Sequence, residues 1–185
     1  MITHRLRVGE TGTPVSLIFL DGIDPVELAD YTAKVYGETE ARGAWITEGT
    51  TGVTKRPTKT FTASASTDRI TSNGHKVEEL QQVVLSNSGG ALPAGLSAST
   101  RYFARNVSPN DFQLSVRPSG ALVNITDAGT GTHSFYVEGV VKYDFQSADV
   151  DTAGNFALEI RLYDGSNNVK YSRTVRVPVE EMEAV

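Results

Sequence analysis

The sequence contains no cysteine among its 185 residues. Thiolate nucleophiles, cysteine-ligated zinc, iron–sulfur clusters and disulfides are therefore excluded, and the fold has to rest on burial of apolar surface alone. Long hydrophobic runs are also missing. The run near the start, VSLIFL at residues 15–20, is far shorter than the roughly 20 residues of a membrane-spanning helix. The N-terminus shows no signal-peptide pattern, so we expect an unprocessed, soluble chain with no membrane partner.

An excess of basic residues is absent as well. Lys and Arg number 17 against 22 Asp and Glu, which gives a net charge of −5. Non-specific binding to nucleic acid depends on neutralising phosphates, so we expect no nucleic-acid partner. Residues 68–137 hold five basic and five acidic side chains, and the net negative charge therefore belongs to the flanking segments.

Helical periodicity is scarce, and alternation of apolar and polar residues dominates instead. A hairpin is predicted at the C-terminus, where two alternating runs flank the turn residues Asp164-Gly165 and Asn167-Asn168. The other segments with strand-like patterns are residues 5–8, 15–20, 31–36, 58–63, 82–85, 102–106, 112–116, 123–126, 133–137 and 140–145.

Two short segments have some helical character. Residues 25–29 could form a single turn with Asp24 as N-cap and Pro25 at the first position. Residues 77–84 (VEELQQVV) contain good helix formers, but their flanks leave about two turns, which is marginal for an isolated helix. A strand is favoured over a helix there, and the predicted fold class is all-β.

The domain organisation follows from the glycine-rich middle of the chain, which contains short strand-like pieces at regular spacing. That spacing is typical of a small antiparallel barrel or sandwich. We predict a small β-domain at residues 64–137, inserted into a discontinuous antiparallel β-sandwich formed by residues 1–63 and 138–185. Insertions succeed at exposed loop tips, so the two ends of the insert should be neighbours in space.

Catalytic and metal-binding patterns are sparse. His4, His75 and His133 lie far apart and form no HxH or HxxxH spacing, and no Gly-Xaa-Ser-Xaa-Gly elbow is present. Asp149, Asp151 and the nearby Asn155 could offer oxygen ligands to calcium, although they lack the order of an EF-hand and are equally typical of a loop. No catalytic, cofactor-binding or metal-ligating residue is assigned, and we expect a non-enzymatic protein without a cofactor.

Three further patterns have alternative interpretations. The GTGTH segment at residues 129–133 contains a Gly-Xaa-Gly element, but no helix follows to support an anion, which favours a tight β-turn. Two sequons, at Asn106 and Asn124, fit glycosylation acceptors that a cytoplasmically assembled protein would not use. The aromatic residues Trp45, Tyr31, Tyr36 and Tyr102 could stack on carbohydrate or pack in a core.

The flanking segments resemble the N-terminal domain of phage baseplate upper proteins. The similarity covers about 110 residues and rests on LIFLDG, ADYTAKVYGE and the long final stretch from VKYDFQSADVDTAGNFALEI to RVPV. It implies an immunoglobulin-like sandwich and carries no catalytic residue. In that family the domain anchors a longer chain with a trimeric stem, whereas no heptad segment follows here.

The middle segment resembles a short β-repeat met in phage tail and virion proteins. The quoted motifs are LPAGL, an aromatic strand, NDFQLS, a glycine turn and ITDAGTGTH. The usual upstream HGL..GD approach is replaced by SNGHKVEELQQ, which affects the boundaries of the first strand.

Together the two resemblances imply a structural component of a tailed-bacteriophage virion. We expect an accessory protein of decoration or adaptor type, assembled in the host cytoplasm and docked on the capsid or on the tail and baseplate. Its expected partners are other virion proteins, with homo-oligomers on the particle as a further option. The alternative is a carbohydrate-binding module that uses exposed aromatics such as Trp45 or Tyr102 to contact host glycans.

Overall fold

The computed structural model describes residues 6–7, 14–39, 43–146, 149 and 153–180. The chain divides into two compact units. The host unit combines Met1–Lys55 with Gly139–Val185, and the barrel unit is Arg56–Glu138. Across the described residues the fold is all-β, as the alternating pattern predicted, and its helical content is one 3₁₀ turn.

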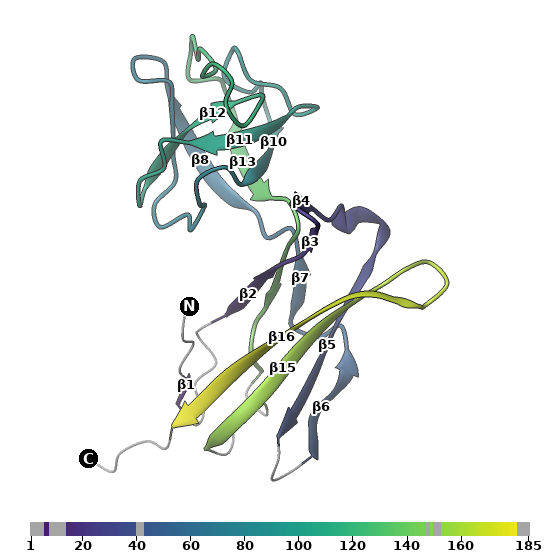
Figure 1. Ribbon diagram of the computed structural model, residues 1–185. Coiled ribbons are helices and arrows are strands. Elements are labelled where there is room, and N and C mark those ends of the chain that lie inside the picture. The colour runs from purple at the N-terminus through teal and green to yellow at the C-terminus, as the bar shows by residue number, and fades with distance from the viewer. Residues whose placement is uncertain (1–5, 8–13, 40–42, 147–148, 150–152, 181–185) are drawn as a thin grey trace, which may run out of the picture. The chain divides into compact units, whose positions relative to one another are not determined.

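The host unit contains two larger sheets and a short hairpin. The order of the first is β1-β16-β15-β5-β6, and the order of the second is β2-β14-β7. The elements are β1 (Leu6–Arg7), β2 (Val15–Ile18), β3 (Leu20–Asp21), β4 (Asp24–Pro25), β5 (Thr32–Thr39), β6 (Gly43–Gly49), β7 (Val53–Lys55), β14 (Val140–Tyr143), β15 (Gly154–Tyr163) and β16 (Val169–Glu180). The long antiparallel β15–β16 pair, drawn in yellow-green and yellow in Figure 1, confirms the predicted C-terminal hairpin.

Both larger sheets contribute to one apolar core. Phe156, Leu158, Ile160 and Leu162 alternate along β15 and are buried, as period-2 patterning requires. They belong to the same core cluster as residues of β2 and β14 in the second sheet. The alternate positions of β15 lie on the opposite face of the sheet and carry polar groups, including Glu159.

The predicted helical turn differs from the observed one. A 3₁₀ turn is formed by Leu28–Asp30, while Asp24 and Pro25 belong to β4, so Asp24 does not cap a helix. Lys55 stabilises the turn, because its ammonium group donates to the Leu28 carbonyl at 2.9 Å and to the Tyr31 carbonyl. The amine thus joins the Tyr31 amide, which donates to the same Leu28 carbonyl at 3.4 Å, in holding the turn.

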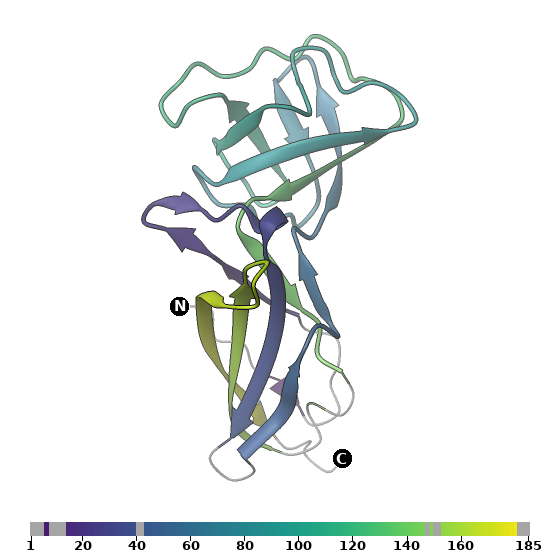
Figure 2. The same ribbon diagram turned by 90° about the vertical axis from the view of Figure 1, so that its right-hand side faces the viewer.

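The barrel unit is a closed sheet of six strands in the order β10-β11-β12-β9-β8-β13. The strands are β8 (Lys59–Ser64), β9 (Arg69–Thr71), β10 (Gln82–Ser88), β11 (Arg101–Arg105), β12 (Asp111–Ser115) and β13 (Thr132–Val137). In both ribbon views they wrap around a common interior (Figure 1, Figure 2). That interior is aromatic and aliphatic, with Phe112 and Phe135 packed edge to face at 5.4 Å.

Strand β8 belongs to the barrel unit, whereas the sequence pattern placed residues 58–63 in the flanking segments. In the structure β8 pairs with β13 and β9, so the barrel unit begins at Arg56 rather than at residue 64. Residues 77–84 also divide differently, because β10 begins only at Gln82 and Leu80 adopts a left-handed conformation (φ 68°). A helix through this segment is therefore absent.

The chain leaves and re-enters the host unit through adjacent strands. β7 and β14 pair antiparallel, with Lys55 opposite Val141. At the first and last residues of the barrel unit, the Arg56 guanidinium pairs with the Glu138 carboxylate at 2.8 Å and stacks on the Tyr136 ring. The Glu138 side chain is 1% exposed and the Arg56 side chain 23%, so a buried carboxylate and a partly buried guanidinium join the two ends of the barrel unit.

Replacing Arg56 with Met should lower the free energy of unfolding of the barrel unit by about 3 kcal/mol, because a buried carboxylate loses its charged partner. Chemical denaturation of the full chain measures this. The matched control is Lys170→Met, which removes an exposed pair with Asp164 (3.2 Å) and should cost less than about 1 kcal/mol. Equal effects of the two substitutions would contradict the role given to Arg56.

Candidate functional site

Two loops of the barrel unit bring the predicted motifs together. Loop A is residues 89–96, which contains LPAGL, and loop B is residues 126–131, which contains DAGTG. Backbone hydrogen bonds join them: the Thr126 amide donates to the Ala94 carbonyl at 3.1 Å, and the Thr130 amide donates to the Ala91 carbonyl at 2.9 Å. The two motifs are thus complementary halves of one structural feature.

Asp127 anchors this arrangement with a single carboxylate oxygen. That oxygen accepts hydrogen bonds from the amides of Ala94 in loop A and Gly129 in loop B, both at 2.8 Å. These two backbone donors lower the pKa of Asp127, which keeps it ionised. The carboxylate therefore stabilises the loop pair and is not poised for proton transfer.

His133 has a similar structural role. Its Nε2 lies 3.0 Å from the Ala128 carbonyl and its Nδ1 lies 2.7 Å from the Asn87 amide nitrogen. Both ring nitrogens are thus occupied within the barrel unit. Residues 130–131 of the GTGTH segment form a bend, and Thr132 and His133 already belong to β13. From that strand the histidine stabilises loop B through the Ala128 carbonyl.

Glycine allows the close approach of the two loops. A Cβ on Gly95, whose φ is 99°, would lie 2.2 Å from the Asn124 carbonyl oxygen. A Cβ on Gly129, whose φ is 67°, would lie 2.6 Å from the Pro93 nitrogen. Both positions exclude a side chain on steric and conformational grounds.

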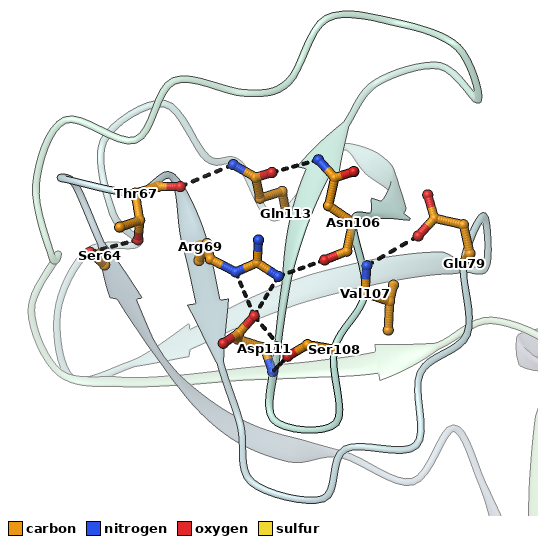
Figure 3. Close-up of polar contacts among 9 residues, drawn as sticks. All are labelled: Ser64, Thr67, Arg69, Glu79, Asn106, Val107, Ser108, Asp111 and Gln113. Atoms are coloured by element: carbon orange, nitrogen blue, oxygen red, sulfur yellow. Dashed lines mark hydrogen bonds and ion pairs between the residues drawn. The ribbon is translucent and has the colours of Figure 1, made fainter.

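The NDFQLS motif is the centre of a second polar network (Figure 3). The Asp111 carboxylate accepts hydrogen bonds from the Ser108 hydroxyl at 3.0 Å and from Nε of Arg69 at 2.5 Å. Arg69 also donates to the Asn106 carbonyl. The Ser108 hydroxyl and the neighbouring guanidinium lower the pKa of Asp111. This network joins β9 to the connection between β11 and β12.

The outer part of the same network is built from amides and a carboxylate (Figure 3). The Asn106 amide donates to Gln113 at 2.7 Å, and Gln113 donates in turn to the Thr67 carbonyl at 3.0 Å. Glu79 accepts from the Val107 amide at 3.1 Å, and this hydrogen bond lowers the pKa of its carboxyl group. The side chain of the Asn106 sequon is thus a structural donor.

His75 lies at the inner side of this network and is 5% exposed. Its Nδ1 accepts from the Val77 amide at 2.9 Å, and its ring packs edge-on against Phe112. Burial penalises the charged ring and lowers the pKa of His75. The neutral ring is therefore part of the folded barrel. His4, the remaining histidine considered in the sequence, lies outside the described residues.

The polar face of the host sheet carries another cluster. Glu48 receives hydrogen bonds from Lys34 at 3.3 Å, Arg161 at 3.0 Å and the Tyr163 hydroxyl. The Tyr163 hydroxyl is the main cause of the lowered pKa of Glu48. Arg161 also pairs with Glu159 at 2.6 Å. Within this cluster of two basic and two acidic side chains each charge has an opposite partner, so the cluster itself is neutral.

Asp149, one of the candidate calcium ligands, already has hydrogen-bond partners within the chain. The Asp149 carboxylate accepts hydrogen bonds from the Tyr143 hydroxyl and the Gln146 amide, both at 2.6 Å. Asn155 is exposed on β15, and Asp151 lies outside the described residues. Among the residues that the structure describes, no group of three or more His, Asp or Glu side chains could hold a metal ion.

The aromatic platform proposed for sugar binding is not formed by Tyr102. This residue is 3% exposed, and its hydroxyl accepts a hydrogen bond from the Ser97 amide at 2.9 Å. It is therefore a core residue of the barrel. The side chain of Trp45 lies outside the described part of the molecule.

The other two aromatics in that prediction are half-buried. Tyr31 packs edge-on against Tyr171 with ring centroids 5.7 Å apart. Tyr36 lies beneath the guanidinium of Arg161, at 5.0 Å from the ring centroid. Both rings thus have intramolecular partners in the host unit.

Comparison of the chain with family models, curated proteins and solved structures found no match. Within the described residues, no helix has the length and apolar character needed to cross a membrane.

Gly95→Ala should lower the free energy of unfolding of the barrel unit by about 1–3 kcal/mol, because the new methyl group strains the backbone and meets the Asn124 carbonyl. Gly165→Ala is the control, since no atom lies within 4 Å of that Cβ position, and it should change stability by less than about 0.5 kcal/mol. Denaturation midpoints that shift equally would refute the interlocked loops.

Protonation of His75 gives a pH-dependent prediction. Its pKa is lowered in the folded state from 6.5, so below that pH the unfolded chain binds a proton that the folded chain does not. The free energy of unfolding should therefore fall as the pH drops from 6.5 toward about 5, a range above the pKa values of ordinary carboxyl groups.

The measurement is urea denaturation of the full chain across this pH range, with His75→Gln as the comparison. Removal of the titrating ring should flatten the pH dependence. A variant with the same slope as the natural chain would show that His75 does not cause it.

Proposed function

We propose that the chain is a non-enzymatic structural component of a tailed-bacteriophage particle. It would be an accessory protein docked on the capsid or on the tail and baseplate, with other virion proteins as its partners. In this proposal the host unit is an immunoglobulin-like sandwich of the kind found at the N-terminus of baseplate upper proteins, and the barrel unit is the phage β-repeat.

One observation carries most of the proposal. The residues that give the middle segment its resemblance to the phage repeat are those that determine the shape of the barrel. Gly95 and Asp127 hold loops A and B together, and Asp111 joins β9 to the β11–β12 connection. Motifs with such contacts determine the fold of the barrel and not a catalytic site. This is what we expect of a β-module that recurs in particle proteins with different functions.

The mode of insertion offers further support. Because β7 and β14 are adjacent, the barrel unit can be added to the host unit without disturbing its strand order. A two-unit chain of this kind is suited to docking through one unit while the other remains available for a second contact. The internally paired charges on the host sheet also favour a specific protein partner over non-specific attraction.

The test is to purify particles encoded by the genome that carries this gene and to examine them by quantitative mass spectrometry and cryo-electron microscopy. The proposal predicts a stoichiometric component whose density fits two linked β-units. Density over the icosahedral shell would identify a decoration protein, and density confined to the tail would identify an adaptor. Absence of the chain from purified particles would overturn the proposal.

A further inference from the structure

An open cleft of about 990 Å³ lies within the barrel unit, along β8 and the end of β9. Loop B and the start of β13 form its opposite side. The cleft is lined by Thr58, Lys59, Thr60, Phe61, Thr62, Ala63, Thr71, Ser72, Asn73, Ala128, Gly129, Thr130, Gly131, Thr132 and His133.

Hydroxyl groups dominate this lining. Six of the lining residues are threonines and one is a serine, whereas Lys59 is the single formally charged side chain among them. Its ammonium group is already bound to the Gly74 carbonyl at 2.7 Å. Each hydroxyl offers one donor and two acceptor sites, so the cleft can both donate and accept hydrogen bonds without a strong electrostatic preference.

Strand register aligns these hydroxyls across the outside of the barrel. Thr60 on β8 lies opposite Ser134 on β13, and Ser134 lies opposite Ser86 on β10. On the other side of β8, Thr62 lies opposite Thr71 of β9. Neighbouring strands are about 4.8 Å apart, so the register creates a continuous two-dimensional array of polar groups.

Most of this array is free to bind a ligand. Thr60, Thr62 and Thr71 are exposed, and their side chains form no hydrogen bond with another described residue. Alternating residues of a strand that face water are often charged, as on the host sheet. The exposed outer positions of β8, Thr60 and Thr62, are uncharged, which is a departure from that pattern.

Ser72, the residue after Thr71, is 8% exposed and lines the cleft, and its backbone amide is bound to the Asn110 carbonyl at 2.8 Å. Its side chain alternates with that of Thr71 and lies on the same side of the strand as the buried Ile70. The exposed hydroxyls of the array are therefore those of Thr60, Thr62 and Thr71.

We propose that this cleft binds a neutral saccharide chain, with the Thr60, Thr62 and Thr71 hydroxyls as direct hydrogen-bond partners. A polyanion is a poor fit because Lys59 is the lone cation of the lining and is already engaged. An apolar ligand would desolvate the hydroxyls without replacing their bonds to water. A neutral saccharide supplies alternating donors and acceptors, and the open cleft accommodates a chain that extends in both directions.

The site differs from the aromatic platform that Trp45 or Tyr102 was expected to form. Two rings line the cleft, those of Phe61 and His133, and both residues are buried. Binding through hydroxyls alone should be weak, on the order of 0.1–1 mM, because each hydrogen bond replaces one to water. The site does not depend on the proposed virion role, so the two proposals fail separately.

The test uses the full chain labelled with ¹⁵N. Cellohexaose, maltohexaose and N-acetylchitohexaose are each added to about 10 mM, roughly ten times the upper limit expected for the dissociation constant. At least one probe should shift amide resonances that are confined to β8, residues 71–73 and loop B. A screen of neutral and acidic glycans immobilised on an array extends the set of probes.

The Thr60→Val, Thr62→Val double variant removes two hydroxyls while it keeps the size and β-branching of the side chains. It should weaken binding of the active probe by about fivefold or more, since two hydrogen bonds are lost. Thr71→Val should also weaken binding. Thr174→Val, an exposed site on β16 of the host unit, is the control and should leave the affinity unchanged.

Three outcomes would overturn the inference. The first is the absence of binding to every neutral glycan in both assays. The second is shifts that lie outside the cleft or persist unchanged in the double variant. The third is tighter binding of acidic than of neutral glycans, which would indicate an anion site centred on Lys59.

Discussion

The antiparallel pairing of β7 with β14 is the constraint on which the rest of the structure depends. It completes the second sheet of the host unit and places Lys55 opposite Val141. The peptide bonds that lead into and out of the barrel unit therefore start from neighbouring strands. Because the ends of the insert are already close, closing it costs little additional chain entropy, and the Arg56–Glu138 ion pair joins them. A six-stranded barrel can then close on itself without contributing a strand to its host.

Inside the barrel unit, the residues usually inspected for chemistry stabilise the backbone instead. Asp127, Asp111 and Glu79 are ionised because amides, a hydroxyl and a guanidinium donate to them. The two described histidines have structural contacts at Nδ1, and His133 has one at Nε2 as well. Such satisfied polar groups fix irregular loops between short strands, a task that an apolar core alone cannot perform. The cleft beside β8 is different, because the exposed hydroxyls of Thr60, Thr62 and Thr71 there form no hydrogen bond with another described residue.

The sequence alone predicted the elements in which local signals agree. Alternation over β15 and β16 and the Asp164-Gly165 turn specified the C-terminal hairpin, because both act over a few residues. It misassigned β8, since the T-K-T-F-T pattern shows a strand without revealing that its partners are β13 and β9. The left-handed Leu80 and the hydrogen bond that buries the Tyr102 hydroxyl are likewise products of tertiary packing. Alternating threonines were a visible signal for the cleft, but their common face emerges only from the strand register.

The most direct test of this account is the hydrogen-exchange protection of the isolated segment 56–138, measured by NMR and compared with the same amides in the full chain. The account predicts a dispersed spectrum and similar protection in β10, β12 and β13, because the barrel sheet closes within this segment and holds its own core. A collapsed spectrum with unprotected amides would contradict it, and would show that the barrel requires the host unit in order to fold.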